Sequence, residues 1–149
     1  MSDIIPNIFI IDQAEKKIHF NEDNLVVAFY NGVFDEPVIR DSISYDSFPL
    51  SAYEKEETNG YTSGGVDVTG NTVTVDLETD EVYYDIDDVV ITASGGPIGP
   101  IRYAGLYNSS NNNNFIYFFD FLEEKTVEDG ASFKLRIDNE GLMKAKQNN

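Results

Sequence analysis

The chain has 149 residues and a net charge of −17, from 27 acidic and 10 basic side chains. This charge would repel nucleic-acid phosphates, and the absence of cysteine excludes disulfides, thiolate metal sites and cysteine nucleophiles. An apolar content of 41% predicts one packed domain. Because there is no apolar run that could span a bilayer and no leader pattern, we expect a soluble, unprocessed chain.

The N-terminal segment 4–11 is apolar and interrupted by Pro6, which predicts an edge strand or an arm that lies on a neighbouring protein. Further strands are expected at 18–20 and 25–30. The second of these, LVVAFY, is apolar throughout, which is typical of a strand covered on both faces. Pro37 predicts a short helix over 38–44, and Asp46 is placed to cap another one-turn helix that ends at Pro49.

Beyond Gly60 the sequence is mostly strand-like. Residues 72–77 alternate between polar and apolar side chains, which predicts one face on the core and one in water. The next strands are expected at 81–86 and 87–93, followed by an irregular connection that contains Gly95, Gly96, Pro97, Gly99 and Pro100.

Residues 101–107 and 115–121 form the strongest predicted strand pair, and the Asn-rich insert 108–114 between them is expected to be an exposed hairpin tip. A final hairpin is predicted from 133–137 and 142–145, closed by Gly141 with a positive φ. The aromatic run 115–121 is expected to be a central strand with both faces buried in the core. The alternative is that its face with Tyr117, Phe119 and Phe121 packs against another subunit.

These eight or nine strands, with one or two short helices, predict an all-β fold: an antiparallel β-sandwich or a partly open barrel. The expected organisation is an N-terminal arm with the first strands, a β-sandwich domain and a frayed tail, at residues 1–23, 24–146 and 147–149.

Candidate residues for chemistry are few. His19 is the single histidine and has no accompanying nucleophile motif, and Gly64-Gly65 lacks the lysine and helix of a phosphate loop. Paired carboxylates would suit a glycosidase, but the tryptophan platforms of sugar sites are missing. Asp85, Asp87 and Asp88 could bind a structural calcium ion, although turn residues that cap their own backbone explain them as well. We therefore expect no enzyme activity and no cofactor.

Several short motifs follow one another in a fixed order. The sequence GYTSGG at 60–65 precedes the strand at 71–75, an acidic strand at 85–92, RYAGLY at 102–107, a DF pair at 120–121 and a closing GLMK at 141–144. In this order and spacing, from about residue 24 to 146, the chain resembles a family of small virion proteins of tailed phages.

The resemblance implies a non-enzymatic virion component, and a capsid decoration or cement protein is the leading hypothesis. Its partners would be the major capsid protein or other virion proteins, with a homo-oligomer expected and no nucleic acid or membrane. The segments expected to make contacts are 4–11 and 33–53. The interface residues predicted in them are Ile4, Ile5, Ile8, Phe9, Ile10, Phe34, Val38, Ile39, Phe48, Leu50 and Tyr53.

Three alternatives remain open. The chain could belong to the neck or tail of the phage instead of the head. It could be an acidic mimic of DNA that inhibits a host enzyme, although its acids are scattered through nearly every turn. The third is a carbohydrate-binding or hydrolytic β-domain.

Overall fold

The computed structural model describes residues 3–47, 49–138 and 141–146. Every strand pair in this part of the chain is antiparallel, so the fold is all-β, as predicted. The elements are α1 (Asn7–Ala14), β1 (Leu25–Tyr30), α2 (Glu36–Arg40), the 3-10 helix η1 (Leu50–Ala52), β2 (Val66–Asp67), β3 (Thr72–Asp76), β4 (Glu81–Asp85), β5 (Val89–Thr92), β6 (Ile98–Asn108), β7 (Asn114–Val127), β8 (Ser132–Leu135) and β9 (Met143–Lys146).

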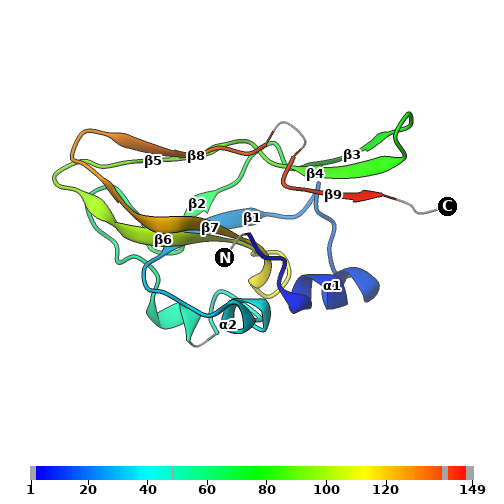
Figure 1. Ribbon diagram of the computed structural model, residues 1–149, viewed down its shortest axis with the longest axis horizontal. Helices are drawn as coiled ribbons and strands as arrows, with labels where there is room; N and C mark the ends of the chain where they lie inside the picture. Colours follow the sequence, from blue (N-terminus) through cyan, green and yellow to red (C-terminus); the bar gives the residue numbers. More distant parts are fainter. Residues whose placement is uncertain (1–2, 48, 139–140, 147–149) are drawn as a thin grey trace.

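A four-stranded sheet with the order β2-β1-β6-β7 occupies the middle of the molecule (Figure 1). β1 is buried along its whole length, which confirms the prediction of a strand covered on both faces. β6 and β7 pair as predicted and are the longest strands described, with 11 and 14 residues. Because β6 begins at Ile98, Gly99 and Pro100 belong to this strand, but its pairing with β7 is irregular between Ile98 and Ile101.

Two smaller sheets form a second layer, above the four-stranded sheet in Figure 1. One contains β5 and β8, and the other has the order β3-β4-β9. Alternate residues of β1, Val27 and Phe29, pack in the upper core with Val89 and Leu135 of the two-stranded sheet. The fold is therefore sandwich-like, with its larger core between the two β layers.

Helices and loops cover the opposite face of the four-stranded sheet, at the bottom of Figure 1. The other alternate residues of β1, including Val26 and Tyr30, pack there with Ile39 of α2 and Leu50 of η1. This second core explains why β1 has no polar residue on either face. No helix in the described ranges is long and apolar enough to cross a membrane.

The N-terminal segment is a helix and not an edge strand or an arm. Pro6 is the N-cap of α1, with φ −69° and ψ 150°. Proline removes the N–H that a strand would need but is tolerated at a helix start. Only Ile4 pairs as a strand would, because its N–H and C=O each bond to Phe118, at 3.0 and 2.9 Å.

Two further strand predictions are wrong. Residues 18–20 form no strand, although Phe20 is buried. The predicted hairpin of 133–137 with 142–145 does not form, because β8 pairs with β5 and β9 pairs with β4. Gly141 does have a positive φ, of 85°, and a side chain there would meet the carbonyl oxygen of Tyr84. The chain thus turns from one sheet into the other at this point.

Three local predictions need correction. α2 begins at Glu36, two residues before the predicted start, because Asp35 and not Pro37 precedes the first turn. The second short helix is the 3-10 turn η1, which begins at Leu50. The alternating strand β3 does not bury one face on the core, since Val73 and Val75 are 39% and 57% exposed.

The Asn-rich insert is not simply an exposed tip. Asn108 and Asn111 are 0% and 9% exposed. The insert contacts α1 and the segment before β1 through its side-chain amides, because asparagine both donates and accepts hydrogen bonds.

Candidate interaction surface

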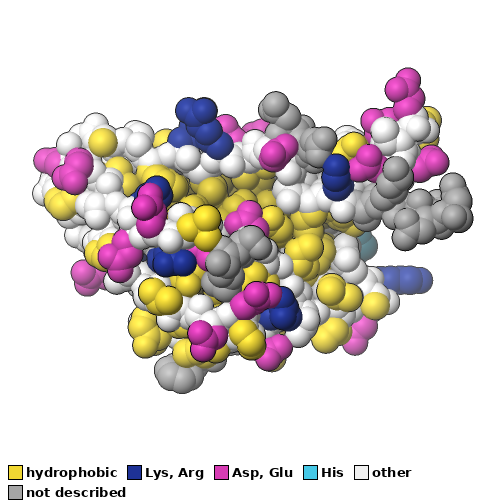
Figure 2. Space-filling view, in the orientation of Figure 1, with side chains coloured by type: hydrophobic (Ala, Val, Ile, Leu, Met, Phe, Trp, Pro, Cys, Tyr) yellow, Lys and Arg dark blue, Asp and Glu magenta, His cyan; other side chains and the backbone are white. Residues whose placement is uncertain are grey.

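Exposed apolar side chains are concentrated on the helices and loops that cover the lower side of the four-stranded sheet. Their exposed fractions run from 36% at Val38 to 74% at Val33. Figure 2 shows hydrophobic side chains recurring over this lower half, with acidic side chains among them. We call the surface the helical face; its residues are Ile5, Ile10, Ile11, Val33, Val38, Ile43 and Tyr53.

The helix α1 divides its side chains between the core and the helical face. Phe9 and Asp12 lie three residues apart and are buried, at 3% and 1% exposure. Ile10 and Ile11 lie on the other side of the helix and are 59% and 50% exposed. The helix is anchored by one apolar and one charged side chain, so its outer isoleucines are held in place.

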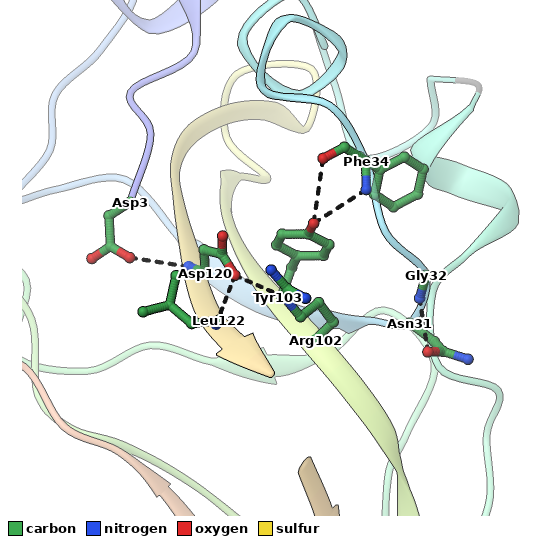
Figure 3. Close-up of polar contacts among 8 residues, drawn as sticks. All are labelled: Asp3, Asn31, Gly32, Phe34, Arg102, Tyr103, Asp120 and Leu122. Carbon is green, nitrogen blue, oxygen red and sulfur yellow. Dashed lines mark hydrogen bonds and ion pairs between the residues drawn. The ribbon is translucent and has the colours of Figure 1, made fainter. Parts of the chain in front are cut away.

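The segment 31–53 is anchored in the same way. Ile39 and Leu50 are each 1% exposed and belong to the lower core. The Phe34 ring packs edge-on against Tyr53, at 5.0 Å between centroids. The Tyr103 hydroxyl accepts a hydrogen bond from the Phe34 N–H at 3.1 Å, as Figure 3 shows. These contacts fix Tyr53 at the edge of the helical face.

A carboxylate surrounded by tyrosines ties this segment to β6. Glu54 accepts hydrogen bonds from the hydroxyls of Tyr45 and Tyr61 and, at 2.7 Å, from the N–H of Gly64. Tyr107 donates to the carbonyl oxygen of Gly64 at 2.6 Å. Burial, with the nearby Glu54 charge, raises the pKa of Tyr107 to about 12 and raises the pKa values of Tyr45 and Tyr61 further. These phenols are hydrogen-bond donors and not bases.

A second buried charge lies at the bulge of β7, drawn in Figure 3. Asp120 Oδ1 accepts from Arg102 Nε at 2.9 Å and from the Leu122 N–H at 2.8 Å, while the Asp120 N–H donates to Asp3 at 3.0 Å. The side chains of Arg102 and Asp120 are 17% and 2% exposed. Leu122 has a φ of +67° and is 63% exposed. The pair therefore stabilises a bulge that turns Leu122 outward.

The predicted interface residues divide by their exposure. Ile5, Ile10, Val38 and Tyr53 are exposed, and Ile8 and Phe34 are half-buried. Ile4, Phe9, Ile39 and Leu50 are buried in the chain's own cores, and Phe48 lies outside the described residues.

The helical face also includes three residues that were not predicted individually: Ile11, Val33 and Ile43. They lie in or next to the two predicted contact segments. The helical period of α1 would have indicated Ile11, since it follows Ile10 on the side away from Phe9.

In the acidic cluster only Asp85 caps its own backbone, whereas Asp87 and Asp88 bond to residues distant in the sequence. Asp85 accepts from the next backbone N–H, Asp87 from a threonine hydroxyl and Asp88 from the N–H of Ile137 at 2.7 Å. Within the described ranges, no three His, Cys, Asp or Glu residues form a group that could hold a metal ion. His19 is exposed, in a turn before β1.

The aromatic face of β7 packs inward. Phe119 is 7% exposed in the upper core, and Tyr117 and Phe121 are half-buried against it. Next to it lies a cleft of about 620 Å³ whose lining includes Asp3, Tyr117 and Arg136. The charges around it are of both signs.

No protein-family model, curated protein or solved structure matches this chain. The class that the fold defines is therefore an all-β, sandwich-like protein with a helical face. The resemblance to phage virion proteins stays a prediction from the sequence.

Proposed function

We propose that this protein is a structural component of a phage virion that binds the outer surface of the capsid as a decoration protein. In this proposal it makes and breaks no covalent bond. The helical face is its contact surface, and the β layers hold that face in a fixed shape.

The observation that carries the proposal is the group of exposed apolar side chains on the helical face. Burying apolar surface contributes about 25 cal/mol per Å², so isoleucines, valines and a tyrosine held at one surface favour association with another protein. Tyrosine is also enriched at the centres of interfaces.

The acidic surface restricts the partner. Asp35, Glu36 and Asp41 lie among the apolar residues of the segment 33–53, and Glu36 forms an ion pair with Arg40. A partner with basic groups at the rim of its contact would complement this face, whereas the phosphates of nucleic acid would be repelled.

Binding of this kind stabilises a capsid by mass action. A protein that binds the assembled shell and not the free subunits shifts the equilibrium toward the shell. The anchored side chains of α1 and of the segment 31–53 reduce the ordering that binding requires, because the face exists before the partner arrives.

The first test is the composition of purified phage particles from the source of the chain. We expect a component of 16.7 kDa in a fixed ratio to the major capsid protein. A ratio near one copy per capsid subunit or per cluster of subunits indicates the head, and a few copies per particle indicate the neck or tail. Absence of the chain from mature particles contradicts the proposal.

The second test is binding of purified variants to particles that lack the protein. We expect Val38→Asp and Ile43→Asp each to weaken binding about tenfold or more, because each places a charge in an apolar contact. The matched control is Val90→Asp on β5, where the valine is 46% exposed against 36% for Val38. If all three variants lose binding equally, or none does, the helical face is not the contact.

A further inference from the structure

The three-stranded sheet has two outer edges, β3 and β9, which lie on opposite sides of β4 (Figure 1). In the described part of the chain no strand pairs with either of these edges. The first four residues of β3 are exposed, including Val73 and Val75. An exposed edge strand rich in valine and threonine readily accepts a further strand.

The two edges have matching faces. The pairing of Thr74 with Tyr83, and of Tyr83 with Lys144, places these three residues on one face of the sheet. The pairing of Val73 with Tyr84, and of Tyr84 with Met143, places apolar residues on the other face. If β3 of one molecule paired with β9 of another, the polar residues of both strands would therefore lie on one face of the joined sheet and the apolar residues on the other.

The two edges also carry opposite charges. The hairpin 72–85 has five acidic residues, Asp76, Glu78, Asp80, Glu81 and Asp85, and no basic one. The sequence of β9, Met-Lys-Ala-Lys, has two lysines and no acid. Asp76, Glu81 and Lys144 belong to the same polar face of the sheet.

We propose that β3 of one copy of this protein pairs with β9 of a second copy, so that the sheet continues from molecule to molecule. β3 and β9 run in the same direction, because each is antiparallel to β4. If a second copy is shifted sideways in the plane of the sheet without being turned over, its β9 therefore lies parallel to β3 of the first copy.

Charge favours the pairing of β3 with β9 over the two symmetric pairings, β3 with β3 and β9 with β9. Two β3 edges would bring Asp76 and the acidic turn that follows it against the same groups of the other copy, and two β9 edges would bring lysine against lysine. Only β3 with β9 joins opposite charges. The contact is head-to-tail, so the copies form a ring if their rotation closes and a chain if it does not.

The contact is small, with strands of five and four residues. An interface of this size is weak for two free molecules, and it strengthens when neighbours are already held on a common surface. This self-association goes beyond the proposed function and does not require it, since it is measured on the purified protein alone.

The experiment is sedimentation equilibrium of the full chain at low salt, over about 1 μM to 1 mM, the range of weak association. We expect reversible association. Asp76→Lys and Lys144→Glu should each raise the dissociation constant about tenfold or more, because each makes one edge repel the other.

An equal mixture of the two variants provides the decisive measurement. In the mixture, the new lysine on β3 of Asp76→Lys meets the new glutamate on β9 of Lys144→Glu. The unchanged β9 of the first variant and the unchanged β3 of the second also carry opposite charges. We expect the mixture to associate like the wild type. Because Lys144 also contacts Glu81 at 3.4 Å, recovery in the mixture separates pairing from any loss of folding in Lys144→Glu.

The matched control is Glu56→Lys, an exposed residue outside the sheets that changes the net charge as much as Asp76→Lys does. It should not weaken the association. A protein that stays monomeric up to about 1 mM, an association unaffected by either variant, or a mixture that stays monomeric overturns the proposal. Binding of these variants to particles tests the helical face separately.

Discussion

At the scale of single residues, the tyrosines around Glu54 show how hydrogen bonds decide what a buried phenol contributes. The Tyr61 hydroxyl accepts from the Phe29 N–H at 3.1 Å and donates to Glu54 at 2.9 Å. The hydroxyl of Tyr30 is equally buried and has no partner in the described part of the chain. A buried hydroxyl without a partner costs free energy, whereas a paired one contributes.

We therefore predict opposite effects for two matched substitutions. Tyr61→Phe should lower the free energy of unfolding by about 2 kcal/mol, because it leaves the buried Phe29 N–H unpaired and removes one of the hydrogen bonds to Glu54. Tyr30→Phe should leave it unchanged or raise it by about 1 kcal/mol. Urea unfolding of both variants measures the difference. Equal losses would show that the hydrogen bonds of the Tyr61 hydroxyl add nothing to its contribution.

The same tyrosines predict a dependence on alkaline pH. Burial raises the pKa of Tyr107 to about 12 and raises the pKa values of Tyr30, Tyr45, Tyr61 and Tyr117, all from 10.0. Because the folded values lie above the unfolded value, the stability that they contribute is complete below pH 10 and is lost as the pH rises through 12.

The free energy of unfolding should fall by about 1.4 kcal/mol per pH unit above 10 for each tyrosine that stays protonated in the folded state. Ultraviolet titration of tyrosinate should show one group of tyrosines that ionises near the ordinary pKa and a second group that ionises only as the chain unfolds. Ionisation of all nine tyrosines in one step, with the fold intact, is the result that contradicts this.

At the scale of elements, the Asn-rich insert between β6 and β7 holds α1 in place. Asp12 of α1 accepts hydrogen bonds from the side-chain amides of Asn111 and Asn114, at 2.9 Å each. The carboxylate is 1% exposed, so these amides replace the water that would otherwise solvate its charge. A low-complexity sequence thus serves as a specific contact between a hairpin and a helix.

Asp12→Ala should accordingly lower the free energy of unfolding by about 3 kcal/mol, since two amides lose a charged acceptor in a buried position. The control is Asp41→Ala, which removes an exposed contact with the Asn7 amide and should cost less than about 1 kcal/mol. Chemical denaturation measures both, and hydrogen exchange should increase in α1 for Asp12→Ala only. Equal effects would mean that the insert does not anchor the helix.

At the scale of the whole molecule, the layers place two different surfaces apart from each other. The helical face lies below the four-stranded sheet, and the three-stranded sheet, with its two outer strands β3 and β9, lies above it (Figure 1). One surface is apolar with acidic residues around it, and the other offers main-chain hydrogen bonds and charges of both signs. The proposed contact with a partner and the proposed contact with a second copy would therefore use separate surfaces.

Much of the fold could be predicted from local pattern. The run LVVAFY indicated a strand buried on both faces, and the aromatic pair of β6 and β7 was visible from their length and composition. The helix α1 was missed because a short apolar run has no distinctive period, and Pro6 fits a helix start as well as a strand edge. Of the candidate contact surface, the two segments were predicted but the inward and outward residues were not separated.

What the sequence determined by itself is the class of the fold, the central strands and the acidic surface, because side-chain period, β-propensity and charge are local properties. What only the tertiary structure decided is the partner of each strand and the exposure of each apolar residue. β8 and β9 are neighbours in the chain, yet they join different sheets, since Leu135 is buried in the upper core and Met143 packs beside Tyr84. That choice depends on the total burial of the folded chain, which no single segment contains.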